Sequence, residues 1–185
     1  MKKLLKCSLL VFLSLIVTTG CTGRKIKEEK GRESDEVISN PKVDNENKDT
    51  FKIYDVDNNT YELVEPYDFS IKSNELINKK VDMIIKEIMD RWFVGLEYKT
   101  SIIKEDNKQI VVIDLIDKGI DTPNGWYSKF QGSTGGTINS KRIVNNIIQK
   151  DYKGEWVQGV KVLYNGQKPE FEHAPELGKT IYDWI

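Results

Sequence analysis

The 185-residue sequence contains very little cysteine: Cys7 and Cys21 are its two thiols. Beyond Cys21 there is none, which excludes thiol catalysis, cysteine–metal sites and redox switching in everything that follows. Histidine is just as scarce, because His173 is the single one. A lone histidine cannot supply the several convergent ligands that a metal site needs. We therefore expect no catalytic residues, no metal and no cofactor.

An excess of either charge is also absent. The sequence has 28 Lys and Arg residues against 29 Asp and Glu residues, and removing the three lysines of residues 1–20 leaves a formal net charge of −4. A mildly acidic chain has no electrostatic basis for binding nucleic acid. It also lacks the basic clusters of proteins that adhere to anionic lipid surfaces. Nucleic acid is therefore excluded as a predicted partner.

Long hydrophobic runs are scarce, and the clearest one lies near the start of the sequence. Lys2, Lys3 and Lys6 come first, an apolar run over residues 8–17 follows, and small residues occupy 18–20. Basic, apolar and small is the order of a secretory signal. The run is too short for the roughly 20 residues that a membrane span needs. A single-pass anchor is therefore the weaker alternative.

The end of this segment resembles a bacterial lipobox, in which small residues precede an invariant cysteine, here Gly20 before Cys21. The resemblance implies a diacylglyceryl thioether on Cys21, cleavage before it, and often acylation of the new N-terminus. Two acyl chains or more hold a protein stably at a membrane. We therefore predict a lipoprotein signal peptide over residues 1–20 and a lipid anchor at the extracytoplasmic face of the cell membrane. The alternative is an ordinary signal peptide followed by a chance cysteine.

Aromatic residues are missing from residues 22–50, which contain seven Lys and Arg and eight Asp and Glu residues. Such a stretch cannot bury enough apolar surface to offset the loss of chain entropy on folding. We predict that residues 21–50 form a disordered, charged tether. Such a tether would hold a domain away from the membrane surface.

Aromatic and β-branched residues begin at Phe51, and residues 51–185 have the normal size of one domain with one core. Alternating apolar residues predict a hairpin between 51–56 and 60–64. Apolar residues at helical spacing predict a helix over 77–92, with Ser73 or Asn74 as its cap.

The second half of the domain shows two further strands, a helix and a last strand. The apolar run 110–115 is typical of a central strand buried on both faces. The elements are predicted over 96–104, 110–115, 138–150 and 159–164, with a loop over 117–136. This order predicts an α+β fold in which two helices pack on one side of a small mixed β-sheet.

Four segments together resemble a known family. They are the helix over 77–92, the hairpin that ends in the apolar strand 111–115, the helix around 143–148 after a glycine-rich loop, and the strand within 156–166. They are similar to the GerMN domain of sporulation and spore germination proteins, over roughly residues 51–175. The resemblance implies a fold related to ring-building motifs and an extracytoplasmic, membrane-tethered module that acts through protein contacts. It supplies no catalytic residues, so the expected function is non-catalytic protein interaction.

The aromatic residues Trp126, Tyr127 and Phe130 lie in the loop predicted before the second helix. Exposed aromatics on a rigid scaffold commonly mark recognition sites. We therefore predict that these residues form a contact surface for a protein partner or a cell-wall component such as a glycan. The alternative is that they cover the sheet as a satellite of the core.

Other candidate residues favour structural roles. The glycine-rich segment 132–137 precedes a helix, where backbone amides can hold an anion, but it lacks the lysine of a phosphate-binding loop. Asp114 is expected to end the buried part of its strand or accept backbone hydrogen bonds, although burial in a catalytic site is an alternative. With Asp117 and Asp121 it lacks the spacing of a calcium loop.

A cell-wall-binding or cell-wall-hydrolysing lipoprotein is the alternative function. A hydrolase of this kind needs two acidic residues that face one cleft. No such pair stands out from the surface charge of the sequence.

Overall fold

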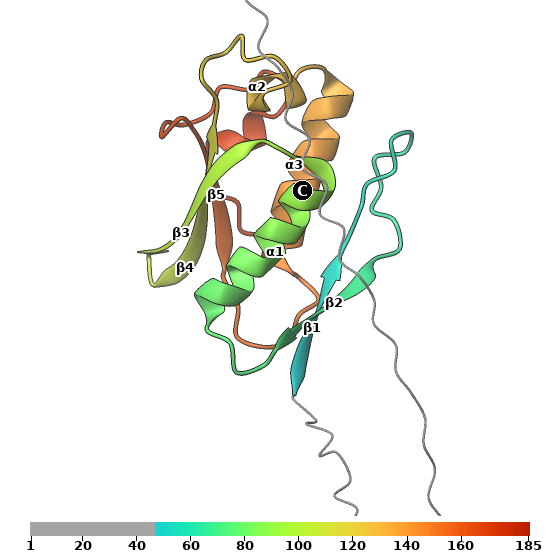
Figure 1. Cartoon of the computed structure of the whole chain (residues 1–185), viewed down its shortest axis with the longest axis vertical. Helices are drawn as coiled ribbons and strands as arrows, with labels where there is room; N and C mark the ends of the chain where they lie inside the picture. Colours follow the sequence, from blue (N-terminus) through green and yellow to red (C-terminus); the bar gives the residue numbers. More distant parts are fainter. Residues whose placement is uncertain (1–46) are drawn as a thin grey trace, which may run out of the picture. The chain divides into compact units, whose positions relative to one another are not determined.

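The computed structural model describes residues 47–185. The predicted signal peptide, Cys21 and most of the predicted tether lie outside the described residues. The predicted α+β class is confirmed, with two small sheets and three helices in the described part of the chain. The elements are β1 (Lys48–Ile53), β2 (Tyr67–Lys72), α1 (Ile77–Trp92), β3 (Glu97–Glu105), β4 (Lys108–Ile116), α2 (Trp126–Lys129), α3 (Ser133–Ile148), β5 (Gly159–Tyr164) and the 3-10 helix η1 (Pro175–Gly178) (Figure 1). None of the helices in this part of the chain has both the length and the apolar character of a membrane span.

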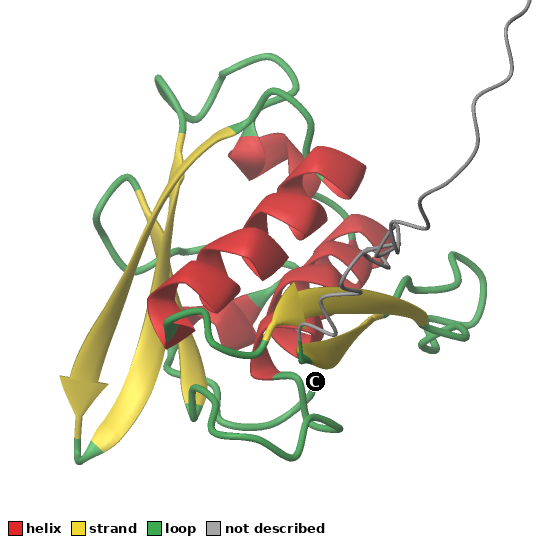
Figure 2. Cartoon of the chain, turned by 60° about the horizontal axis from the view of Figure 1, so that its bottom comes forward, coloured by secondary structure: helices red, strands yellow, loops and turns green. Residues whose placement is uncertain are grey.

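The larger sheet has the order β3-β4-β5 and is mixed. Strand β4 pairs antiparallel with β3, where Ser101 faces Val112, and parallel with β5, where Ile113 faces Val162. A parallel pair needs a crossover connection, and here the crossover contains α2 and α3. Figure 2 shows α1 and α3 between this sheet and the two-stranded sheet.

The central strand β4 is buried along one face and only at Ile110 on the other. Val111, Ile113 and Leu115 are 0% exposed; on the other face Ile110 is 0% exposed too, whereas Val112 and Asp114 are partly exposed. The prediction that this strand is buried on both faces is therefore wrong beyond Ile110. The helices cover one face of the sheet, so the second face of β4 keeps contact with solvent despite its apolar sequence.

The smaller sheet consists of β1 and β2, which pair antiparallel along their whole lengths. The predicted hairpin between 51–56 and 60–64 is wrong, because those segments meet at a single bridge between Val56 and Leu63. Tyr61 adopts a left-handed conformation with φ of 59°, which interrupts the alternation of a strand. The pairing partner of β1 therefore lies further along the chain.

The domain begins slightly earlier than its sequence suggests, since β1 starts at Lys48 and includes the last residues assigned to the tether. Lys80 of α1 fastens this strand: its ammonium donates to Asp49 Oδ2 at 2.6 Å and to the Ser73 carbonyl at 2.9 Å. The hydrogen bond from Lys80 lowers the pKa of the Asp49 carboxyl. This ion pair is largely buried, so the charged residue Asp49 belongs to the folded domain rather than to the tether.

Helix α1 spans the predicted residues, and its predicted apolar face is buried. The buried apolar residues of this helix are Val81, Ile84, Ile85, Ile88 and Met89. The predicted cap is wrong, because the residue before the helix is Leu76 and no side chain caps it. The Ser73 hydroxyl instead donates to Asp49 Oδ1 at 2.8 Å.

Helix α3 begins at Ser133, inside the segment predicted as a loop. The first turn of the helix contains two glycines, which disfavour helix by about 1 kcal/mol each relative to alanine. Tertiary packing explains the difference: a Cβ on Gly136 would lie 2.0 Å from the carbonyl oxygen of His173. The glycine thus allows the helix to approach the backbone of a later segment closely.

Two buried amide side chains, Asn146 in the last turn of α3 and Gln149 just after the helix, close the free edge of β1. Asn146 Oδ1 accepts from the Tyr54 N–H at 2.8 Å, and its Nδ2 donates to the Tyr54 carbonyl at 2.9 Å. Gln149 makes the same pair of bonds with Lys52, at 3.1 and 2.9 Å. These side chains therefore replace a neighbouring strand. The sequence did not indicate that these residues are buried, because a helical pattern assigns polar residues to solvent.

Candidate functional site

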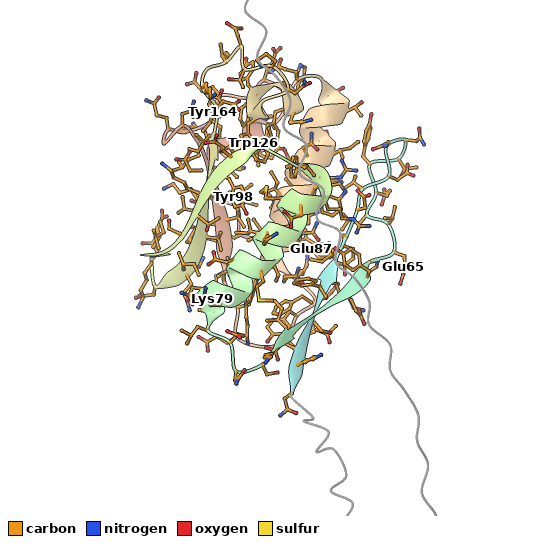
Figure 3. The ribbon with its side chains drawn as sticks, in the orientation of Figure 1. Glu65, Lys79, Glu87, Tyr98, Trp126 and Tyr164 are labelled. Atoms are coloured by element: carbon orange, nitrogen blue, oxygen red, sulfur yellow. The ribbon has the colours of Figure 1, made fainter. Side chains whose placement is uncertain are left out.

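The candidate site lies where the parallel strands β4 and β5 end. Asp117 follows β4 directly, and Tyr164 is the last residue of β5. The carboxyl ends of parallel strands meet at one edge of the sheet, which is a common place for ligand crevices. Figure 3 labels Tyr164 and Trp126 at this end of the sheet. The loop 117–125 and helix α2 cover it.

Asp117 organises this end of the sheet. Its carboxylate accepts from the N–H groups of Trp126 and Tyr127, both at 2.9 Å, and from the Tyr164 hydroxyl at 3.2 Å. Gly125 leaves room for it, because a Cβ there would lie 2.6 Å from Asp117 Oδ1. Burial, followed by the nearby Asp117 carboxylate, raises the pKa of Tyr164 to about 12. Asp117 therefore holds the start of α2 in place.

Two of the three predicted contact aromatics are buried. Trp126 and Phe130 are both 0% exposed. The Trp126 Nε1–H donates to the Glu97 carbonyl at 2.7 Å, and its ring lies 4.9 Å from that of Phe93. Phe130 stacks on Phe171 at 4.4 Å. The prediction that Trp126 and Phe130 are exposed is therefore wrong. Helix α2 turns these side chains inward, which the composition of a loop does not reveal.

Tyr127 is the half-buried member of the predicted set, and it lines a cleft of about 350 Å³. Its ring lies 6.3 Å from Tyr164 and 6.0 Å from Phe171. Ile120, beside them, is 56% exposed despite its apolar side chain. We call this the aromatic cleft; its full lining is Ile120, Tyr127, Tyr164, Gln167, Lys168, Glu170 and Phe171.

Two other cavities are less suited to recognition. The larger, about 560 Å³, lies beside the β3–β4 turn and is lined by residues such as Lys104 and Gln158. The other, about 380 Å³, lies along the loop 117–125 beside Leu96 and Pro123. Neither has an aromatic ring in its lining. Binding sites combine apolar or aromatic walls with a few polar groups, and the aromatic cleft has both.

The remaining candidate residues have structural roles. Asp114 Oδ1 accepts from the Gly166 N–H at 2.8 Å and so closes the turn after β5. The segment 132–137 lies mostly within helix α3, where the Gly136 N–H donates to the Gly132 carbonyl at 2.9 Å. His173 packs its backbone against that helix. Between residues 47 and 185, no group of three His, Cys, Asp or Glu side chains is placed to hold a metal ion.

No protein-family model, no curated protein and no solved structure matches this chain. The similarity to GerMN domains therefore stays a prediction that depends on the residue patterns described above.

The sequence did not indicate most of the cleft. Ile120 lies in the same predicted loop as Tyr127, but Tyr164 and Phe171 lie far beyond it in the sequence, and no local pattern joins them to Tyr127. One signal was available: Tyr164 ends a strand that was correctly predicted. A side chain at the carboxyl end of a parallel strand is well placed for a crevice. That signal requires knowing that β5 pairs parallel with β4.

Proposed function

We propose that this chain is a lipid-anchored extracytoplasmic protein whose α+β domain is a non-catalytic protein-interaction module. The resemblance to GerMN domains supports a role in sporulation or spore germination. The observation that carries the proposal is the aromatic cleft, in which the exposed Ile120 side chain adjoins the half-buried rings of Tyr127 and Tyr164. An apolar and aromatic centre is typical of the residues that dominate protein contacts.

The cleft also has the polar rim and the rigidity that protein contacts favour. Gln167 and Glu170 lie in its lining and supply hydrogen-bonding groups. The loop that carries Ile120 is closed by Thr122, whose hydroxyl donates to the Gly119 carbonyl at 2.7 Å. A surface that is ordered before binding loses less conformational entropy on association. The cleft is therefore suited to hold a segment of a partner protein.

The charged groups around the cleft support a non-catalytic role. Hydrolysis by paired carboxylates requires two acidic side chains that face the substrate. Glu170 is the one acidic residue in the lining of the cleft, and the nearby Asp117 accepts two backbone N–H groups.

Site-specific crosslinking tests this proposal in the native cells. A photoreactive phenylalanine derivative at position 120 is expected to give one defined adduct with a protein partner. The same group at Met83, which is 40% exposed on α1, is the matched control and should give none. Tyr127→Ala should reduce the adduct at position 120, since the ring forms part of the same wall. The partner is then identified by mass spectrometry of the adduct.

Two results of this experiment would contradict the proposal. Equal adducts from positions 120 and 83 indicate chance encounters over the whole surface. Lack of any protein adduct at position 120, with the protein correctly located and folded, removes the cleft as an interaction site.

The membrane anchor gives a separate prediction. Cys21→Ala is expected to release the protein from membranes or block its processing, because the acyl chains would have no attachment site. Cell fractionation follows the protein, and intact-mass analysis of the membrane fraction measures the modification. Cys21→Ser is the conservative companion and should behave in the same way. A mature protein that begins elsewhere and carries an unmodified Cys21 would show that the lipid anchor is wrong.

A further inference from the structure

A second cavity lies next to the aromatic cleft. Its volume is about 320 Å³, and Lys168 lines both cavities. It lies along the outer edge of β5 and is lined by Lys161, Lys179 and Thr180 as well. We call it the lysine pocket.

The lysine pocket exists because the edge of β5 is closed on either side of it. Val160 exchanges two hydrogen bonds of 2.8 Å with Ile181, and Gln167 closes the turn at the end of the strand. Pro169, which is buried, has no N–H and cannot extend this pairing inward. Because a strand alternates with a period of two residues, the N–H of Val162 points to the same edge as that of Val160. That edge borders the pocket.

Three lysines contribute to the lining of this pocket, and two of them have no acidic partner in the described part of the chain. Lys168 and Lys179 form no ion pair with any residue between 47 and 185, whereas Lys161 pairs with Glu105 Oε2 of β3 at 3.9 Å. The stem of Lys168 crosses Gly178, where a Cβ would lie 2.9 Å from its Cε. Unpaired positive charges raise the local potential, and an anion bound beside Lys168 and Lys179 lowers the energy of both.

We infer that the partner segment bound by this protein is acidic, with an apolar or aromatic side chain in the aromatic cleft and a neighbouring carboxylate in the lysine pocket. The inference rests on the proposed function, because the cleft supplies one of the two contacts. The two cavities adjoin, because Lys168 lines both of them. A peptide also matches the free strand edge, because a carboxylate or carbonyl oxygen can accept from the Val162 N–H.

A direct titration tests the inference. The probe is the acetylated and amidated pentapeptide Asp-Glu-Phe-Asp-Glu, added to the isotopically labelled full chain in detergent micelles. Its uncharged analogue Asn-Gln-Phe-Asn-Gln and inorganic phosphate are titrated in parallel. The acidic peptide is expected to shift the backbone amide signals of Val162 and Thr180 together with that of Tyr127. The uncharged analogue should bind about tenfold more weakly, since it loses the charged contacts.

Matched variants separate a specific pocket from general attraction. The test variant replaces Lys161, Lys168 and Lys179 with glutamine and is expected to weaken binding of the acidic peptide about tenfold. The control makes the same charge change at three exposed lysines elsewhere, Lys79, Lys104 and Lys153. It should change binding less than about twofold, because distant surface charges are screened.

Several results would overturn the inference. Equal weakening by the two triple variants indicates attraction without a site. If phosphate shifts the amide signal of Val162 and the peptide leaves the amide signal of Tyr127 unchanged, the pocket is a site for small anions. A full adduct at position 120 in the triple variant of the pocket lysines leaves the interaction module standing but removes the acidic partner. If the protein with its three pocket lysines intact gives no adduct at position 120, the proposed function itself is wrong.

Discussion

Replacing Trp126 with alanine is expected to lower the free energy of unfolding by about 3–5 kcal/mol, because it opens a large cavity in the core. The ring is 0% exposed, and its Nε1–H donates to the Glu97 carbonyl. Tyr127→Ala removes a half-buried ring and should lower the free energy of unfolding by about 1–2 kcal/mol. The two neighbouring substitutions are therefore expected to differ in their effect on stability, because Trp126 is a core residue and Tyr127 lines the cleft.

Urea denaturation of the full chain measures this difference. Trp184→Ala is the matched control, since the same substitution there removes a ring that is partly exposed and packs on Tyr54 at 5.1 Å. It should lower stability by about 1–2 kcal/mol. If Trp126→Ala is as mild as Trp184→Ala, the tryptophan is not part of the core. If Tyr127→Ala leaves the yield of the adduct at position 120 unchanged, the ring makes no contact with a partner.

The second large effect is expected at Asn146, where alanine should lower the free energy of unfolding by about 2–4 kcal/mol. The substitution leaves the N–H and the carbonyl of Tyr54 without their partner amide. Each buried polar group without a hydrogen bond costs about 1–3 kcal/mol. The residue is 0% exposed, so water does not replace the amide without local opening of the strand. Stability should fall although no apolar surface is lost.

Asn139→Ala in the same helix is the matched control. Asn139 makes one hydrogen bond, from Nδ2 to the Lys129 carbonyl at 2.7 Å, and it is partly exposed. Its replacement should cost about 1 kcal/mol. Hydrogen exchange adds a local readout, because the Tyr54 N–H should exchange faster in the Asn146 variant than in the control. Equal stability losses, or an unchanged Tyr54 exchange rate, would show that the amide does not close the edge of β1.

The spacing of apolar residues predicted the bounds of the elements that have a regular apolar face. Helix α1 spans the predicted residues because its apolar side chains recur at helical spacing. The strand Gly159–Tyr164 also has its predicted bounds. Helix α3 begins earlier than predicted because the close approach of Gly136 to the His173 carbonyl, rather than propensity, decides its first turn. The hairpin prediction fails for a similar reason, since β1 pairs with a later segment than its nearest one.

The candidate site was predictable only in part. Of the three aromatics that the sequence indicated, Tyr127 lines the aromatic cleft. It gave the wrong orientation for Trp126 and Phe130, because a loop composition cannot show that four residues form the short helix α2. The partners of Tyr127 in the cleft come from β5 and from the segment that follows it. Their proximity depends on the parallel pairing of β4 with β5.

The sequence alone determined the α+β class, the extent of α1 and the absence of cysteine chemistry after Cys21, because these follow from periodicity and composition. Tertiary structure alone decided which aromatics are core, which strand pairs with β1, and why Asn146 and Gln149 are buried. The physical reason is distance along the chain. The bond between Gln149 and Lys52 joins residues 97 positions apart. A polar side chain is stable inside the protein once a distant backbone group satisfies it, and no local pattern reports that partner.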